Sequence, residues 1–444
     1  MRSTSREKLR SGAAVRPGGV VLSQWPLWAL VVIASLALRF WVLQLIGTAE
    51  LGGDTLNNLR MAENLLSGRG LVLDDPFNVP NMRATYPPLY PILLAGVGTV
   101  LPLSILVIAL LNTMFDFACA GLLVLLGRQL GLANAGRLAA MLYILWPTHI
   151  GLAPVGRKEA LIAVFVVGLL CILVALARRP NFRLAAGYGV VAGLLGLTQP
   201  GLITLPALFA LAMLPWFADK KAWLKAMFFA VGCTMLVLAP WWIRNWLLFH
   251  RFVPLTLAGE YGLWVGATPT GDGTWVQPPP RFRQGDEFAM AAAMGAEARA
   301  IIAADPVRYL VHCAMKFGRA MVSDVHGAAV LKWVDPRTNA PLAWCWAIVA
   351  AVLHLAAMWL ALLFAAIRRC DPLKSILLAG IAQMLLFGIW FEFDERHRYF
   401  LTPILLLCAS ASLLSLLTRM QSATAPTAAI AQEMVAEEGL GRPP

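Results

Sequence analysis

Charged residues are scarce in this chain, and their scarcity excludes a soluble globular protein. Of 444 residues, 14% are Asp, Glu, Lys or Arg and 59% are hydrophobic, whereas soluble domains carry about 25% charged residues. A chain this apolar, with a mean hydropathy of +0.70, has too much apolar surface to hide in a water-soluble core. The formal net charge of +12 comes mostly from short basic clusters between apolar runs. That distribution fits the loops of a membrane protein and argues against a nucleic-acid-binding face.

The short motifs of metal, redox and nucleotide chemistry are also missing. The seven cysteines are scattered, mostly inside apolar runs, and none forms a CxxC pair. This pattern excludes a disulfide framework and a cysteine-based metal site. The six histidines show neither HxxH nor HExxH spacing, so the sequence carries no zinc signature, and it has no Walker loop and no GxGxxG.

Long apolar runs dominate the sequence and predict an all-α, polytopic membrane protein. A transmembrane helix needs about 20 mostly apolar residues, and about ten runs meet that criterion or come close to it. We expect spans at 25–46, 105–127, 138–154, 159–177, 184–199, 201–217, 223–242, 344–367, 373–391 and 398–418. The run 88–103 is shorter and bracketed by prolines, so a re-entrant or interfacial helix is expected there.

Basic residues orient these spans. With a cytoplasmic N-terminus, every inner connection is short and basic, as the positive-inside rule requires. The outer loops would then form a cap over a lipid-accessible cavity. The expected organisation is a basic cytoplasmic N-terminus at 1–24, a first span at 25–46, an extracytoplasmic loop with juxtamembrane helices at 47–104, a helix bundle at 105–242, an extracytoplasmic segment at 243–343, C-terminal spans at 344–418 and a disordered cytoplasmic tail at 419–444.

The outer segment 243–343 carries its own helix signals. A small-residue helix is expected over 288–304. Asp305 and Pro306 then form an N-cap and first-turn pair that opens a second helix over 307–321. This second helix is amphipathic, which favours a position along the membrane surface.

Several charged residues break the orientation rule or lie at a membrane boundary. Asp54 follows the first span closely, where a bare carboxylate is poorly solvated. Inserting a basic side chain at membrane depth costs about 2.5–3.5 kcal/mol of free energy. A protein retains such a costly charge where the charge has a partner. Candidate partners are Asp54, Glu159, Asp394 and Glu395. The basic groups concerned are Arg39 inside the first span, Arg157 and Lys158 in a short outer turn, Arg244 at the outer end of the seventh span, and Arg396 and Arg398 before the tenth.

Each of these residues alone could be a structural ion pair or a snorkelling side chain. Together they gather cations and carboxylates at one membrane face, beneath two outer loops. That arrangement suits an anionic head group whose tail lies in the bilayer, such as a lipid phosphate.

Several stretches resemble one family, and they follow one another from Arg39 to about Arg419. They are GGDTLNNLRMAENLLSGRGL with TYPPLYPILLAG, VGRKEALIAVF, APWWIRNWLLFHRFVPLTLAGEYGLWVGATPTGDGTW, AADPVRYLVHCAMKFGRAM and FDERHRYFLTPILL. They are similar to the polyprenyl-phosphate-sugar-dependent glycosyltransferases with the GT-C fold. That superfamily includes the protein O-mannosyltransferases, the aminoarabinose transferases of lipid A and the galacturonosyltransferases of rhizobial lipopolysaccharide.

The resemblance implies a glycosyltransferase of the plasma (inner) membrane with its active site on the extracytoplasmic side. It implies that Asp54 is the catalytic aspartate and Glu159 the second acidic residue. The chain departs from the family at Asn58, where a tyrosine is common, and at Gln199, where an arginine often precedes the proline; both bear on sugar specificity. The resemblance places Arg157, Lys158, Arg244, Arg396 and Tyr399 near the donor phosphate, and Arg39, Asn58, Tyr86 and Gln199 are candidate substrate contacts.

The chemistry that this implies is simple. A polyprenyl phosphate leaves as a stable anion without an acid, so the reaction needs a base for the acceptor hydroxyl and cations for the phosphate. Direct attack predicts inversion at the anomeric carbon, with Asp54 as the base. Asp54 and Glu159 could also hold Mg²⁺ or Mn²⁺, which favour oxygen ligands, although the sequence does not require a metal.

Two other classes of protein share some of these features. A transporter or flippase of lipid-linked sugars would explain the spans and the buried charges, but not the structured outer segment or the lack of internal repeats. A non-catalytic scaffold or lipid-binding protein leaves the misplaced charges unexplained. The sequence leaves open the sugar, the polyprenyl length and the acceptor, which could be a cell-envelope glycan, lipopolysaccharide or a protein.

Overall fold

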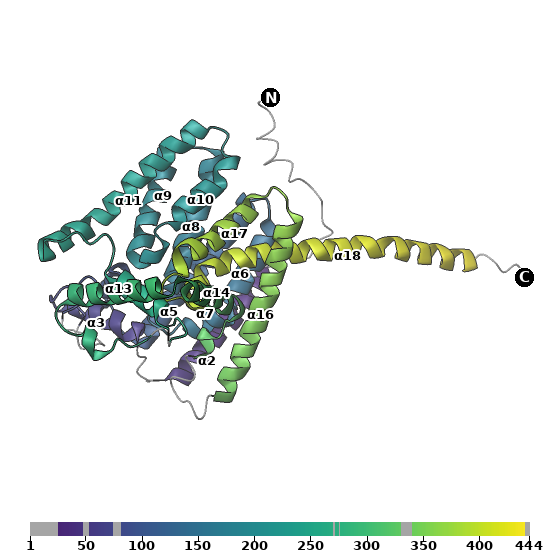
Figure 1. The fold of residues 1–444 in the computed structure, drawn as a ribbon. Helices are drawn as coiled ribbons and strands as arrows, with labels where there is room; N and C mark the ends of the chain where they lie inside the picture. Colours follow the sequence, from purple (N-terminus) through teal and green to yellow (C-terminus); the bar gives the residue numbers. More distant parts are fainter. Residues whose placement is uncertain are drawn as a thin grey trace, which may run out of the picture.

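The computed structural model describes residues 25–47, 53–73, 81–269, 271–274, 276–329 and 340–439. The basic segment 1–24 and the end of the predicted tail, 440–444, lie outside the described residues. The described chain is a bundle of helices (Figure 1), and its one pairing of extended backbone is an isolated bridge between Leu73 and Met82. The prediction of an all-α fold is confirmed.

Six helices in the described part are long and apolar enough to cross a membrane. They are α2 (Trp25–Ile46), α5 (Ile105–Gln129), α8 (Glu159–Arg178), α11 (Lys220–Phe249), α16 (Ala340–Ile367) and the segment Glu395–Gln421, which joins the 3₁₀ helix η5 (Glu395–Leu401) to α18 (Thr402–Gly439). Large apolar side chains such as Phe228, Leu236 and Trp359 are exposed on their outer faces, a surface that suits lipid and not water. The chain is therefore a multi-pass membrane protein.

Shorter apolar helices complete the bundle. They are α4 (Leu89–Gly98), α9 (Phe182–Thr198), α10 (Leu205–Met213) flanked by η1 (Pro200–Leu202) and η2 (Leu214–Trp216), and α17 (Pro372–Gln383) continued by the π-helical turn η4 (Met384–Gly388). Helix α4 lies within the predicted interfacial segment 88–103, and the others coincide with predicted spans. The predicted count of about ten spans therefore depends on helices shorter than the usual 20 residues.

Three helices differ from the sequence prediction. The run 138–154 forms two helices, α6 (Ala133–Ile144) and α7 (Pro147–Leu152), because Pro147 lacks the N–H that a continuous helix requires. Helix α11 continues beyond residue 242 to Phe249, with Pro240 inside it. The tail predicted to be disordered continues α18 to Gly439 and projects from the bundle (Figure 1), which its many alanines favour.

Helices α8 and α18 lie at the centre of the bundle. In the most apolar window of each, 72% of the residues are buried, compared with 22% for α2 and α11. Helix α8 packs against α5 and α9, whereas α18 packs against α16 and α6. Helix α8 contacts η5, and residues of two polar segments, 156–159 and 392–399, line one cavity at this end of the core.

The loops at this end contain their own helices. They are α3 (Asp54–Leu66) in the first loop and α12 (Ala258–Ala267), η3 (Pro280–Phe282), α13 (Glu287–Ala304) and α14 (Pro306–Val322) in the second segment. The two predicted helices of the second segment are confirmed as α13 and α14. The Asp305 side chain caps α14, accepting a hydrogen bond from the Arg308 backbone at 2.9 Å. Helix α14 exposes Leu310, Val311 and Met315, as its amphipathic pattern predicts.

A buried carboxylate joins the two loops. Glu287, at the start of α13, accepts hydrogen bonds from the backbone of Arg83 at 2.9 Å and Ala84 at 3.0 Å, and from the Thr85 hydroxyl at 2.8 Å. The Leu257 backbone donates to the Ala84 carbonyl at 3.0 Å. These bonds fix the chain entering α4 over the bundle and place the side chains that follow Ala84.

Candidate functional site

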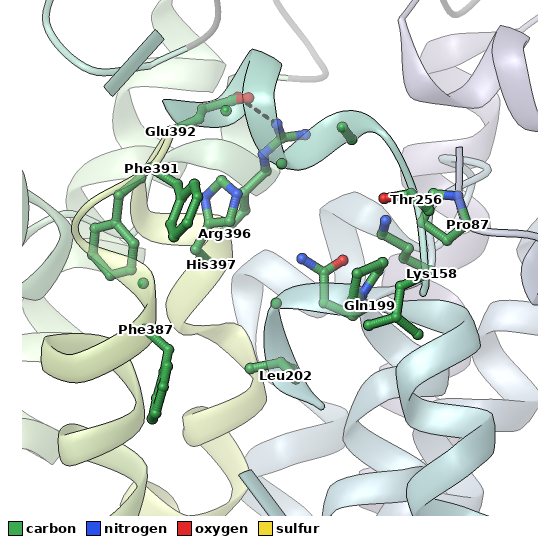
Figure 2. Close-up of a pocket in the computed structure, with 18 of the residues that line it drawn as sticks. Pro87, Lys158, Gln199, Leu202, Thr256, Phe387, Phe391, Glu392, Arg396 and His397 are labelled. Carbon is green, nitrogen blue, oxygen red and sulfur yellow. Dashed lines mark hydrogen bonds and ion pairs between the residues drawn. The ribbon is translucent and has the colours of Figure 1, made fainter. Parts of the chain in front are cut away.

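A cavity of about 520 Å³ lies where α3, the first turn of α8, the η1 turn, α12 and the segment 383–400 meet. Its apolar lining includes Ile162, Leu202, Met384, Phe387 and Phe400, and its polar lining includes Asp54, Tyr86, Lys158, Glu159, Gln199, Glu392, Arg396, His397 and Tyr399. In Figure 2, Lys158 and Gln199 reach from one wall while Arg396 and His397 lie on the opposite wall. The cavity therefore offers a charged end and an apolar end to a single ligand.

Asp54 is the carboxylate at the charged end. It begins α3, and its Oδ2 accepts a hydrogen bond from Nη1 of Arg396 at 2.9 Å. The Asp54 side chain keeps 38% of its surface exposed, so a ligand in the cavity can reach it. Burial alone raises the pKa of Asp54, but the nearby charges of Arg396, Arg157 and Lys158 outweigh burial and bring the pKa to about 2. Asp54 is thus ionised at neutral pH.

Arg396 is bound by three carboxylates at once. Nη1 contacts Asp54 at 2.9 Å, Nη2 contacts Glu392 at 2.9 Å, and Nε lies 3.3 Å from Asp394. Asp394 also accepts a hydrogen bond from the Arg396 backbone at 3.0 Å and pairs with His397 at 2.8 Å. Burial raises the pKa of Asp394, yet His397 and Arg396 lower it further than burial raises it. The guanidinium is therefore held firmly in the cavity wall.

The opposite wall is the turn before α8. The Asn58 amide of α3 donates to the Gly156 carbonyl at 3.0 Å. A Cβ at Gly156 would meet the Thr55 side chain at 3.0 Å, so the missing side chain lets α3 lie directly against the turn. Lys158 follows in the cavity lining. Its position thus depends on the packing of α3, the helix that also carries Asp54.

Lys158 differs from Arg396 in having no partner in the part of the chain that the structure describes. No carboxylate there pairs with its ammonium, although it lines the cavity. Burial lowers the pKa of Lys158, while Asp54 and Glu159 partly oppose that effect. One buried oxygen of the neighbouring Glu159, Oε2, also has no hydrogen-bond partner among the described residues. The Lys158 ammonium is therefore available to a ligand in the cavity, with the Glu159 carboxylate beside it.

Three further candidates line the same cavity. The Tyr86 hydroxyl accepts a hydrogen bond from Asn57 at 3.0 Å, and the Tyr399 hydroxyl donates to Glu395 at 3.2 Å. Gln199 ends α9, and its amide extends toward the cavity (Figure 2). These groups surround the space between the two charged walls.

Other sequence candidates lie outside the cavity lining. Arg39 pairs with Asp116 at 2.6 Å inside the helix bundle. Arg244 donates to the backbone carbonyls of Arg83 at 2.9 Å and Leu71 at 3.0 Å, so it holds the first loop. Arg157 is buried behind the wall in contact with His326, and Asn58 bonds to the turn as described above. These positions favour a role in holding the helices and loops around the cavity, and not direct contact with a ligand.

Sequence reasoning missed three polar residues near the site: Glu392, His397 and His326. Glu392 and His397 belong to the stretch EFDERHRY, whose alternating acids and bases were the available signal and in which Asp394 had been predicted as an ion-pair partner. His326 had no such signal, because it is brought to Arg157 by the fold alone. Burial and the charge of Arg157 lower the pKa of His326 to about 3, so it is neutral at physiological pH.

The carboxylates do not form a site for a divalent metal as they stand. Among the described residues, no group of three or more His, Cys, Asp and Glu side chains is placed to hold a metal ion. Asp54, Glu392 and Asp394 all contact one guanidinium. In the described part, Glu159 is the only cavity carboxylate with a fully buried oxygen that has no hydrogen-bond partner. Mg²⁺ prefers several oxygen ligands in octahedral geometry. As arranged here, these carboxylates bind a guanidinium in place of a metal ion.

Comparisons with known proteins agree with this architecture. No family model matches the chain, and no curated protein matches its sequence. Among solved structures it is similar to the archaeal oligosaccharyltransferase AglB from Archaeoglobus fulgidus in complex with an inhibitory peptide and a dolichol-phosphate, with a TM-score of 0.54 and 16% identity over 95% of this chain and 53% of that chain. The apo form from the same organism gives a TM-score of 0.56 and 16% identity over 91% of this chain and 52% of that one.

A further similarity is to ArnT from Cupriavidus metallidurans in the apo state, with a TM-score of 0.41 and 14% identity over 87% of this chain and 77% of that chain. The chain spans about half the length of the oligosaccharyltransferases that it matches. At these identities the similarity concerns the fold. The chain has the fold of the GT-C glycosyltransferases, as the resemblance in sequence predicted.

Proposed function

We propose that the protein is an integral membrane glycosyltransferase that moves a sugar from a polyprenyl-phosphate donor to a hydroxyl-bearing acceptor. One observation carries the proposal: a single cavity combines an ionised carboxylate, Asp54, with two cations, Lys158 and Arg396, and with an apolar part of its lining that includes Ile162, Leu202 and Phe387. A polyprenyl-phosphate sugar has matching parts, namely an anionic phosphate, an apolar chain and a reacting sugar carbon. Charge-assisted hydrogen bonds from Lys158 and Arg396 would bind the phosphate, and burial against the apolar lining would bind the chain.

The apolar wall gives the donor chain a route from the bilayer. Phe387 of η4 lines the cavity and is 40% exposed. Leu386, beside it, is 57% exposed. This exposed apolar turn supports a path along which the donor chain remains among lipids while the phosphate lies between Lys158 and Arg396.

The reaction needs little from the protein besides positioning and charge. The donor phosphate departs as an anion, so no general acid is required. Lys158 and Arg396 stabilise the charge that grows on the phosphate. Asp54 accepts the proton of the acceptor hydroxyl, which attacks the anomeric carbon directly and inverts it. Tyr86, Gln199 and Glu159 lie around the space where the sugar and the acceptor would meet.

The acceptor and the cellular location are also proposals. The oligosaccharyltransferase with this fold was solved with a dolichol-phosphate and an inhibitory peptide; here we propose a cell-envelope glycan, lipopolysaccharide or protein as acceptor. The short basic connections support an extracytoplasmic position for the cavity, in the plasma membrane. Reporter fusions after Lys221 and Arg369 should report the cytoplasm, and a fusion near Asp394 the outer side. A cytoplasmic Asp394 would overturn the orientation.

A transfer assay tests the function. Purified protein in lipid nanodiscs is incubated with radiolabelled polyprenyl-phosphate sugars and a panel of acceptors. Transfer, or slow donor hydrolysis without an acceptor, is expected, and Asp54→Asn should abolish it. A flippase would instead move labelled donor across vesicles without releasing sugar, and that result would replace the proposed function.

A further inference from the structure

The three carboxylates around Arg396 do not have the same origin. Glu392 and Asp394 belong to the same short segment as Arg396 and are held beside it by chain connection and by the cap of η5. Asp54 comes from α3, which is 342 residues away in the sequence. Separating Arg396 from Asp54 therefore leaves the guanidinium with two partners, whereas Asp54 loses the one ion pair that it makes within the described part of the chain.

This ion pair is at odds with the role of Asp54 as a base. A general base works best when its pKa lies near the working pH, and the pKa of Asp54 is about 2 while the cations surround it. A carboxylate so strongly stabilised takes up a proton poorly. The pair must loosen before Asp54 can accept the proton of an acceptor hydroxyl.

The donor supplies the competing anion. Arg396 lines the cavity opposite Lys158, so a phosphate bound to Lys158 lies within the space that Arg396 also faces. We infer that the Arg396 guanidinium exchanges Asp54 for the donor phosphate, while Glu392 and Asp394 keep it at the cavity wall as positioning residues. This inference rests on the proposed function and adds an order to it: the donor binds first, and its binding releases the base.

The exchange balances the charges of the reaction. The acceptor oxygen bonds to the anomeric carbon, the bond from that carbon to the phosphate oxygen breaks with its electron pair on the phosphate, and the hydroxyl proton passes to Asp54. The phosphate gains one negative charge while Asp54 loses one. Arg396 is therefore best placed on the phosphate when the bond breaks, and Asp54 is best left without it.

The test compares two carboxylates that contact the same guanidinium. The probe is undecaprenyl phosphate, and its Kd is measured in nanodiscs for wild type, Asp54→Asn and Glu392→Ala. Each variant removes one negative charge next to Arg396. If charge alone matters, both variants bind the probe more tightly. The inference expects opposite signs: Asp54→Asn binds about tenfold more tightly because Arg396 is free to move, and Glu392→Ala binds more weakly because the guanidinium loses its support. Glu392→Asp should partly restore binding.

A double-mutant cycle isolates the exchange. In an Arg396→Gln background, Asp54→Asn should no longer tighten binding, whereas the matched cavity variant Glu159→Gln should have a similar effect in both backgrounds. An equal gain from Asp54→Asn in both backgrounds, or tighter binding by Glu392→Ala, overturns the inference. Melting temperatures check folding, and Arg396→Lys replaces Arg396→Gln if the latter does not fold. Wild-type protein that does not bind the probe at all overturns the proposed function itself.

The pH dependence of the reaction distinguishes the exchange from a purely structural ion pair, because a structural pair would give the same acid limb with and without bound donor. The charged and titratable groups facing Asp54 are Arg396, Glu392, Asp394 and His397 from the segment before α18, His326 from the outer segment, and Arg157, Lys158 and Glu159 from the turn and first residue of α8. The acid limb of kcat, measured with donor bound, should lie at higher pH than the acid limb of kcat/KM for the donor. Coincident limbs would mean that Asp54 is not released, which contradicts the exchange.

Discussion

Two arginine–aspartate pairs in this protein have similar geometry and different surroundings. Arg39 meets Asp116 at 2.6 Å, with 5% and 1% of the two side chains exposed. Arg396 meets Asp54 at 2.9 Å, with 18% and 38% exposed. The first pair is enclosed by helices, and its arginine also donates to the Ile144 carbonyl at 3.0 Å. The second pair borders a cavity.

The difference separates a charge that supports the fold from one that can act on a ligand. An enclosed pair has no other partner to accept, because no anion can reach it, so its effect is on folding and helix packing. A pair beside a cavity can exchange one partner for a ligand. Both arginines violate the positive-inside rule, so the charge pattern of the sequence does not distinguish them. They differ in whether a ligand can reach them.

The largest expected effect is the loss of transfer in Asp54→Asn. Removing a general base typically costs 10²–10⁴-fold in rate, and asparagine keeps the size of the side chain without its proton affinity. The protein should remain folded, because Arg396 keeps Glu392 and Asp394. Transfer rate and melting temperature are measured on the same purified variant. Near-normal transfer by the folded variant would remove Asp54 from the catalytic role.

The enclosed pair should show the reverse pattern. Asp116→Asn leaves Arg39 buried without a countercharge, which costs about 3–5 kcal/mol for pairs of this kind. We expect low expression and a clearly lower melting temperature, but unchanged kcat per folded molecule and unchanged probe affinity. Arg39→Met combined with Asp116→Leu should recover much of the stability, since no charge is then left unpaired. A kcat loss in well-folded Asp116→Asn would place this pair in the reaction.

The contrast also explains what could be predicted from the sequence. Apolar runs predict most transmembrane helices because hydropathy is a local property, and the N-cap at Asp305 predicts α14 for the same reason. The break at Pro147 was missed because the apolar run continues through it. Asp54 and Arg396 were found as charges at a membrane boundary, and the family resemblance predicted their roles. The partner of Arg39 was not, because Asp116 is 77 residues away and pairing across helices depends on their packing.

The same reason applies to Arg244 and Glu392. Sequence reasoning placed Arg244 at the donor phosphate, yet it bonds to backbone carbonyls of the first loop, and backbone acceptors leave no mark in a sequence. Glu392 was visible as a charge, but its role depends on the guanidinium that it holds at 2.9 Å. The sequence gives the type of each residue directly, whereas the access of a side chain to a cavity depends on how the helices pack.

A substitution at Lys158 tests a cation that has a role in ligand binding but no ion pair in the described chain. Methionine at this position keeps the apolar stem and removes the charge. A hydrogen bond to a charged group contributes roughly 1.5–3 kcal/mol, so KM for the donor should rise roughly 10- to 150-fold. Because no carboxylate pairs with Lys158 in the described chain, the melting temperature of Lys158→Met should be equal or higher. A lower melting temperature with an unchanged KM would make Lys158 a structural residue like Arg39.

The smallest expected effect is the acid dependence of stability due to the accessible pair. The pKa of Asp54 in the folded protein, about 2, lies below its ordinary value of about 3.9. A lowered pKa means that this carboxylate stabilises the folded state above its ordinary pKa, and that the contribution is lost as the pH falls toward 2. Solvent and salt screen a group that is 38% exposed, so the contribution should be about 1 kcal/mol or less.

Melting temperatures of wild type and Asp54→Asn, measured in detergent from pH 6 to pH 3, should therefore converge on acidification. They should also converge at pH 6 when salt is raised to about 1 M, where screening acts over roughly 3 Å. The deficit of Asp116→Asn should be insensitive to salt, because that pair is enclosed. If added salt reduces both deficits equally, the two pairs are equally accessible, and the distinction between a supporting charge and a working one fails.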